Sequence, residues 1–199
     1  MTATAIERLG ALPPTFTTAE AERAKLWRRH LYRLRDDGDL LELARGVYRK
    51  ADAPETAHLD LLAVTHRAPA GIVCLTSSLA LHGLTDDVPA AVQLAVPRGG
   101  HRPRIAYPPT EVLVFDAATF DLGRDTFEAA PGEQIPLYGP ARSVVDAMRL
   151  RRRVGQPQAL RALRLYLETR GTRPTELLEY ARALDVEGPV RRAVEAVLS

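Results

Sequence analysis

The stretch Thr17–Lys50, TTAEAERAKLWRRHLYRLRDDGDLLELARGVYRK, constrains the fold more than any other part of this 199-residue chain. Its opening threonines suit a helix N-cap, and Glu20 and Glu22 follow them where a helix end carries partial positive charge. A short helix is therefore predicted over residues 19–25. Upstream, another short helix is predicted to end before a Pro-Pro pair that cannot continue it.

A second helix is predicted over residues 27–37. Trp27, Leu31 and Leu34 recur at i, i+4 and i+7, so they should form one buried stripe. Gly38 follows, and glycine readily takes the left-handed conformation that ends many helices. The polar and aromatic residues that fall off the stripe or at its margin are Arg28, Arg29, His30, Tyr32, Arg33 and Arg35.

Two short strands are predicted after this helix, over residues 40–43 and 47–49. They are joined by Ala44-Arg45-Gly46, a tight turn in which Gly46 can take a positive φ. A capped helix, a basic helix and a glycine-turned hairpin, in that order, are typical of a winged helix-turn-helix DNA-binding unit. The sequence therefore predicts such a unit over residues 1–50.

The charge distribution supports a DNA-binding role for this unit. The formal net charge of the chain is only +2, but residues 23–35 contain six basic side chains and no acidic one. In the predicted unit, Arg28, Arg29 and Arg33 would enter the major groove, with His30 and Tyr32 nearby. The alternative is a solvated basic helix that only packs against its own domain. The residues expected to hold phosphates are Thr17, Thr18, Lys25, Arg45 and Arg49.

A second domain is predicted over residues 56–199, after a linker at residues 51–55. Short apolar strands and helices alternate over 56–138, with residues 120–132 expected to be irregular. From Pro140 the chain reads as successive helices, 140–199, with apolar residues at helical spacing. The predicted class is α/β (α+β), with a winged helix-turn-helix followed by a mixed sheet domain that ends in a helical bundle.

The sequence contains no pattern typical of a catalytic, metal or cofactor site. The five histidines do not have a metal-binding spacing, and no phosphate-binding glycine loop occurs. Ser77, Ser78 and His82 lie close on one predicted helix, but no base orienter or oxyanion hole accompanies them. Cys74 is the single cysteine and is expected to be buried. The chain is therefore expected to be a non-enzymatic, cytoplasmic protein without cofactors or membrane spans.

A second basic cluster is found near the start of the predicted helical bundle. Two interpretations remain open for it, a solvated helix face or a surface for a protein partner or a second nucleic-acid contact. Its members are Arg149, Arg151, Arg152, Arg153, Arg161 and Arg164.

The chain resembles the AbiEi family of antitoxins from bacterial type IV toxin–antitoxin and phage-defence operons. The resemblance rests first on FTTAEA, LYRLRDDGDL and LARGVYR, and then on SSLALHGL, VPRGG, IPLYGPARSVVDAMR and LLEYARALDVEGPVRRAVEAVL. The sequence departs from the family pattern before the basic helix, where Lys25 and Trp27 replace an expected glycine and serine cap. This departure affects where that helix starts.

The resemblance implies a transcriptional autorepressor that binds inverted repeats in its own promoter. It also implies antitoxin action against a nucleotidyltransferase-like toxin, without enzymatic activity. The expected state is a monomer or weak dimer, with two copies on DNA. The alternative is an antitoxin that neutralises its toxin by direct contact and uses the winged helix for docking or dimerisation.

Overall fold

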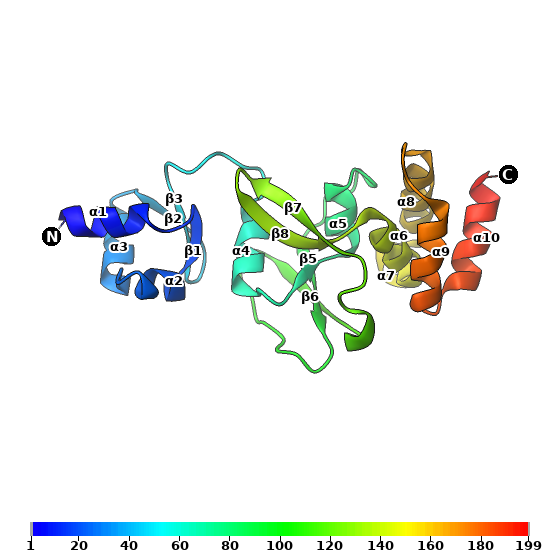
Figure 1. Ribbon diagram of the computed structural model, residues 1–199, viewed down its shortest axis with the longest axis horizontal. Coiled ribbons are helices and arrows are strands. Elements are labelled where there is room, and N and C mark those ends of the chain that lie inside the picture. Colours follow the sequence, from blue (N-terminus) through cyan, green and yellow to red (C-terminus); the bar gives the residue numbers. More distant parts are fainter. Residues whose placement is uncertain (1, 199) are drawn as a thin grey trace. The chain divides into compact units, whose positions relative to one another are not determined.

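The computed structural model describes residues 2–198, which fall into two units with separate cores. Figure 1 labels the helices and strands of both units. The mixed α/β class predicted from the sequence is confirmed, since helices and strands account for about 46% and 20% of the chain. The first unit contains the chain up to Ala70, residues 103–110 and residues 128–135, and the second contains residues 71–102, residues 111–127 and the chain from Pro136 onward.

The first unit is built on a three-stranded antiparallel sheet with the strand order β1-β3-β2. In this sheet Tyr48 of the central strand lies opposite Phe16 on one side and Glu42 on the other. The first strand is too short to be found from residue periodicity. The elements are α1 (Thr2–Gly10), β1 (Thr15–Thr17), α2 (Thr18–Arg23), α3 (Arg28–Asp36), β2 (Leu40–Ala44), β3 (Val47–Lys50) and α4 (Leu59–Arg67).

The hydrophobic core of the first unit confirms most of the predicted stripe. Leu31 and Leu34 of α3 are buried, and burial of each such side chain stabilises the fold by roughly 1.5–3 kcal/mol. The prediction for Trp27 was wrong, because its side chain is 49% exposed while the neighbouring Leu26 is fully buried. The reason is that α3 begins only at Arg28, so Trp27 precedes the helical periodicity.

Two glycines take the positive φ that was predicted for them. Gly38, directly after the C-cap of α3, has φ +86°. Gly46 has φ +77° in the turn between β2 and β3, and Thr18 donates to its carbonyl through both its backbone N–H and its Oγ1. A Cβ at Gly46 would lie 3.1 Å from Thr18 Oγ1, so this turn needs glycine for space as well as for conformation.

Helix α4 packs against the sheet of the first unit. Its Ala63 is buried in a small cluster with Ala44 and Val47 of the wing strands. The first unit therefore contains more than the predicted module 1–50, since it includes α4 and the segment 51–58 before it.

A five-stranded sheet with the order β6-β5-β4-β8-β7 follows in the chain. Strand β4 pairs antiparallel with β5 and parallel with β8, so the sheet is mixed, as predicted. The elements are β4 (Ile72–Val73), α5 (Leu75–Leu81), β5 (Val92–Pro97), β6 (Thr110–Phe115), the 3₁₀-helix η1 (Ala117–Thr119), β7 (Arg124–Ala130) and β8 (Glu133–Tyr138).

The expectation that residues 120–132 are irregular was wrong, because residues 124–130 form strand β7. Its sequence, RDTFEAA, lacks the alternation of apolar and polar residues that marks a half-buried strand. Only its last two residues, Ala129 and Ala130, are buried. The strand is followed by a tight connection in which Gly132 has φ +76°.

The helices after Pro140 surround the larger core of the second unit, as predicted. Val144, Val145 and Met148 of the first of them are buried against side chains of the later ones. The last helix begins at Glu187 and has Gly188 and Pro189 in its first turn, where proline is tolerated. The helices are α6 (Pro140–Arg149), α7 (Arg151–Val154), α8 (Gln156–Glu168), α9 (Pro174–Ala183) and α10 (Glu187–Leu198).

A buried ion pair lies on α6. Arg142 and Asp146 are both fully buried, and Arg142 Nε donates to Asp146 Oδ2 at 2.9 Å. Arg142 also donates to the carbonyls of Thr119 and Leu122, and its guanidinium lies 4.3 Å from the centre of the Tyr138 ring. These contacts tie α6 to the chain segment that precedes β7.

Within residues 2–198, no helix combines the length and the apolar character that a bilayer span needs.

Candidate nucleic-acid interface

Helix α2 begins with a complete capping box. Thr17 Oγ1 accepts from the backbone N–H of Glu20, and the Glu20 carboxylate accepts from the backbone N–H of Thr17 at 2.6 Å. Burial alone would raise the pKa of Glu20, but its hydrogen bonds with Thr17 outweigh this effect and lower it. Thr17 was predicted to hold a phosphate, and here its side chain is engaged in the cap.

The turn between α2 and α3 explains how the chain dispenses with the glycine expected there. Lys25 takes the left-handed conformation, with φ +60°, that a glycine would adopt without steric cost. The Arg8 guanidinium donates to the Lys25 carbonyl at 2.8 Å. This turn directs Leu26 into the core and leaves the Lys25 side chain exposed.

The start of α3 lacks a serine cap, and His30 supplies part of what that cap would provide. His30 Nδ1 accepts from the backbone N–H of Trp27 at 3.3 Å, while the indole of Trp27 offers no acceptor to the first turn. The first residue of α3 is therefore Arg28. Its register places Leu31 and Leu34 inward and turns the arginines outward.

The outward face of α3 carries the side chains predicted to read DNA. Arg28 and Arg33 form ion pairs with Glu22 and Asp37, at 3.3 and 3.5 Å, but remain about two-thirds exposed. Exposed pairs of this kind contribute little energy, so a phosphate or a guanine edge can replace the carboxylate. Arg29, His30 and Tyr32 complete this face, and the structure brings all five together on one helix.

Arg35 belongs to the same basic run in the sequence, but its side chain is bonded to carboxylates beside the outward face of α3. Its guanidinium donates to Asp36 and to Glu42 of β2, and it stacks over the Tyr32 ring at 5.3 Å. The hydrogen bonds that Arg35 donates to Asp36 and Glu42 raise the pKa of Arg35 above its ordinary value. Arg35 therefore links α3 to the wing.

The two wing arginines have different environments. Arg45 is exposed in the turn, and no partner for it is found within residues 2–198. Arg49, in contrast, is 3% exposed; it pairs with Glu133, and donates to Thr15 Oγ1 at 2.7 Å and to the Pro54 carbonyl. The prediction that Arg49 holds a phosphate was wrong, because β3 is the central strand of the sheet and directs this side chain inward.

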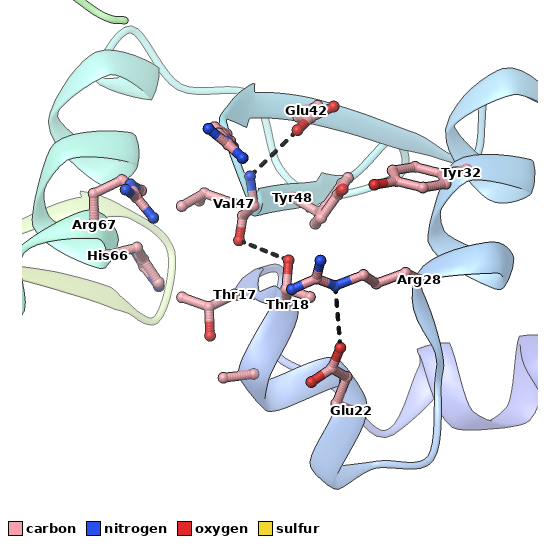
Figure 2. Close-up of a pocket in the computed structure, with 13 residues that line it drawn as sticks. Thr17, Thr18, Glu22, Arg28, Tyr32, Glu42, Val47, Tyr48, His66 and Arg67 are labelled. Atoms are coloured by element: carbon pink, nitrogen blue, oxygen red, sulfur yellow. Dashed lines mark hydrogen bonds and ion pairs between the residues drawn. The ribbon is translucent and has the colours of Figure 1, made fainter. Parts of the chain in front are cut away.

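An open pocket of about 380 Å³ lies between α3, the wing turn and α4. Figure 2 shows Arg28 and Tyr32 reaching it from α3, and His66 and Arg67 from α4. The residues of α4 were not predicted as part of the site. The spacing of residues within 59–67 does not predict this contact, since it is the packing of α4 on the sheet that turns its last residues to the wing.

The second basic cluster is dispersed around its helices. Arg149 is a structural residue, since it donates to the buried Asp146 at 2.7 Å and lies over the Phe115 ring. Arg151 donates to the carbonyl of Met148.

The other four members of that cluster are exposed, and two of them are paired. Arg153 bonds Glu111 at 2.8 Å, and Arg161 pairs with Asp86. Within the described residues, the members that are exposed and have no bonding partner are Arg152 and Arg164.

The serines and histidine of α5 have structural partners. Ser78 Oγ bonds Ser143 Oγ at 2.8 Å and donates to the Leu75 carbonyl, while His82 Nε2 bonds the Tyr138 carbonyl. These side chains are therefore used to attach α5 to its neighbours. Burial raises the pKa of Cys74 well above its ordinary value, which keeps the thiol protonated. No cluster of three potential metal ligands occurs among residues 2–198.

Comparison with solved structures and with curated proteins gives two results. A crystal structure of the RV2827C protein from Mycobacterium tuberculosis superposes with a TM-score of 0.61 at 16% sequence identity, covering 98% of this chain and 75% of that one. This similarity shows a shared fold. No curated protein matches the sequence.

A family model covers the part of the chain that contains the basic helix and the wing. Its description is "Transcriptional regulator, AbiEi antitoxin", and it matches residues 6–49. The matched segment runs from α1 to β3 and includes the capped α2 and the outward arginines of α3. Residues 6–49 of this chain are therefore similar to AbiEi-type antitoxin transcriptional regulators.

Proposed function

We propose that this protein is a sequence-specific autorepressor that acts as the antitoxin of a type IV toxin–antitoxin system. One observation carries the proposal: α3 is anchored by Leu31 and Leu34 and presents Arg28, Arg29 and Arg33 outward, beside a glycine-turned wing. A helix that enters the major groove needs one packed face and one face of hydrogen-bond donors.

The residues of this face have distinct roles in the proposal. Arg28, Arg29 and Arg33 contact base edges and adjacent phosphates, and His30 and Tyr32 lie beside them. Thr18, Lys25 and Arg45 hold the backbone. Thr17 contributes through the capping box, which orients the N–H groups at the start of α2.

The expected operator is an inverted repeat in the protein's own promoter, occupied by two copies. A single small winged helix makes few base contacts, so two half-sites are needed for affinity and specificity. A protein with this role works in the cytoplasm and needs no cofactor or catalytic residue. The proposed toxin is nucleotidyltransferase-like, and the second unit of this chain is the part proposed to serve antitoxin action.

The proposal is tested by gel shift and fluorescence anisotropy with the upstream promoter and a scrambled duplex. Tight binding to the promoter, steeply weakened by salt, is expected, because phosphate contacts release condensed counterions. Incubation with Mg²⁺ should leave the duplex intact. If the protein binds neither duplex at low salt but co-purifies with the toxin, the docking alternative replaces this proposal.

A further inference from the structure

The pocket between α3, the wing and α4 has an unusual supply of unpaired positive charge. Three arginines line it, Arg28, Arg45 and Arg67, together with the glutamates Glu22 and Glu42. Both glutamates are already occupied, Glu22 by Arg28 and Glu42 by Arg35 and by the backbone N–H of Gly46.

Arg45 and Arg67 are the arginines left without a carboxylate. Both side chains are exposed, and within residues 2–198 neither side chain forms an ion pair or a hydrogen bond. They come from different elements, the wing turn and the C-terminal end of α4, and line the same pocket. Two guanidinium groups that line one pocket can together donate hydrogen bonds to an oxyanion such as a phosphate.

Polar side chains also line the pocket. His66 Nδ1 lies 2.9 Å from the Leu62 carbonyl, a contact that uses the hydrogen on Nδ1 because a carbonyl oxygen only accepts. Figure 2 shows His66 beside Arg67 on α4, facing Thr17 and Thr18. The pocket therefore combines fixed charge with polar groups and presents little apolar surface.

The source of the phosphate follows from the position of the pocket. Arg28 and Tyr32 line it and also belong to the outward face of α3. A duplex whose major groove is occupied by α3 must carry its sugar–phosphate backbone past the ends of that helix and past the wing. A backbone phosphate is therefore delivered to this pocket by the same docking event.

We propose that this pocket binds one operator phosphate, with Arg67 of α4 and Arg45 of the wing turn as its two clamps. The inference rests on the proposed DNA-binding function and deepens it. It assigns a DNA contact to a helix outside residues 6–49, the segment that the family model covers. Arg67 fixes the position of the duplex without reading its sequence.

The test compares Arg67→Gln and Arg45→Gln with the wild type, measuring the dissociation constant against KCl concentration for promoter and scrambled duplexes. Arg170→Gln is the matched control, because Arg170 is exposed and without a partner among the described residues and belongs to the second unit. Each pocket variant should lower the slope of log K against log salt by about 1 and weaken binding about fivefold near 0.15 M salt. The preference for the promoter should not change, and Arg67→Lys should retain most of the slope.

The outcomes separate this inference from the function on which it rests. If the wild type binds neither duplex, both fail. If the wild type binds the promoter and Arg67→Gln keeps its full salt slope, only the phosphate pocket is disproved. Free inorganic phosphate is the other possible source of the bound anion. Its binding is measured by titration, with NMR chemical-shift changes of the pocket residues as the readout. Phosphate binding that Arg67→Gln abolishes without change in the DNA salt slope would make the pocket a free-anion site and overturn the proposal.

Discussion

The arginines of α3 and those of α6 to α8 look alike in the sequence but differ in what surrounds them. On α3, Arg28 and Arg33 keep about two-thirds of their side-chain area exposed, and their carboxylate partners are exposed as well. In the second region Arg149 is held by the fully buried Asp146, and its departure would leave Arg142 as the single cation bonded to this carboxylate among the described residues. Arg28 and Arg33 can therefore exchange their carboxylate partners for a ligand, whereas Arg149 cannot.

A basic run in a sequence can form a nucleic-acid surface when its arginine side chains share one exposed face and are held only by weak ion pairs. The α3 face satisfies both conditions, because burial of Leu31 and Leu34 directs the arginine side chains of the helix outward. The second cluster divides its arginines among a buried pair, exposed pairs on different elements and a few free side chains.

The largest expected effect separates structural from binding arginines. Arg142→Ala should lower the free energy of unfolding by roughly 3–5 kcal/mol, because Asp146 would remain buried with only Arg149 as its cationic partner. Urea unfolding followed by circular dichroism measures this change. Arg152→Ala, the exposed control, should change stability by less than about 0.5 kcal/mol. Equal effects of the two variants would contradict the assignment of Arg142.

The next effect concerns binding. Arg28→Ala and Arg33→Ala should each weaken promoter binding by roughly 1–3 kcal/mol and reduce the difference in affinity between promoter and scrambled DNA. Fluorescence anisotropy with both duplexes measures this, and the folding stability should stay near that of the wild type, since both ion pairs are exposed. Unchanged promoter affinity would remove these residues from the recognition face.

A smaller effect tests the turn before α3. Lys25→Gly should stabilise the protein by about 0.5–1 kcal/mol, because relief of the left-handed strain exceeds the extra entropy that glycine adds to the unfolded chain. Lys25→Val should destabilise it. Thermal unfolding of both variants checks the prediction. If the glycine variant is the less stable of the two, Lys25 is not in the left-handed conformation.

The capping box predicts a pH dependence. The pKa of Glu20 lies below its ordinary value of 4.5, so its stabilising effect is present above about pH 4.5 and is lost as the pH falls through the lowered pKa. Glu20→Gln should therefore be less stable than the wild type by about 0.3–1 kcal/mol at pH 6, with a smaller difference at pH 3. Urea titrations at both pH values measure this, and a constant difference would exclude a role for the charge.

The smallest expected effect is on DNA binding through the second cluster. Arg152→Gln and Arg164→Gln, alone or together, should leave promoter affinity and its salt slope unchanged. The measurement is the same anisotropy titration used for α3. A loss of affinity as large as that of Arg33→Ala would show that both regions contact DNA and would contradict the distinction drawn between them.

The sequence predicted features that depend on neighbours in the chain. The Leu31 and Leu34 positions of the α3 stripe, a threonine N-cap before α2 and the positive φ of Gly38 and Gly46 are all decided within a few residues, and all were found. Sequence reasoning failed where the deciding contact is distant. Arg49 was expected on a wing surface, but its partner Glu133 is 84 residues further along the chain.

The candidate site shows the same division. The side chains of α3 were found from their spacing, while the last turn of α4 was missed because only tertiary packing places it beside the wing. Trp27 was assigned to the core for a related reason. Its spacing from Leu31 is helical, but the chain reaches helical geometry one residue later, after the left-handed Lys25.

The buried pair of Arg49 and Glu133 also sets an order of events during protein synthesis. At roughly 5–20 residues per second, about 4–17 s separate the appearance of the two side chains. During that interval the guanidinium of Arg49 has no carboxylate at position 133 to receive it, so the nascent N-terminal unit lacks part of its final support. Completion of this unit therefore waits until residue 133 has been made, and a translation product that ends before it would carry α3 without the ion pair that supports the sheet of the first unit.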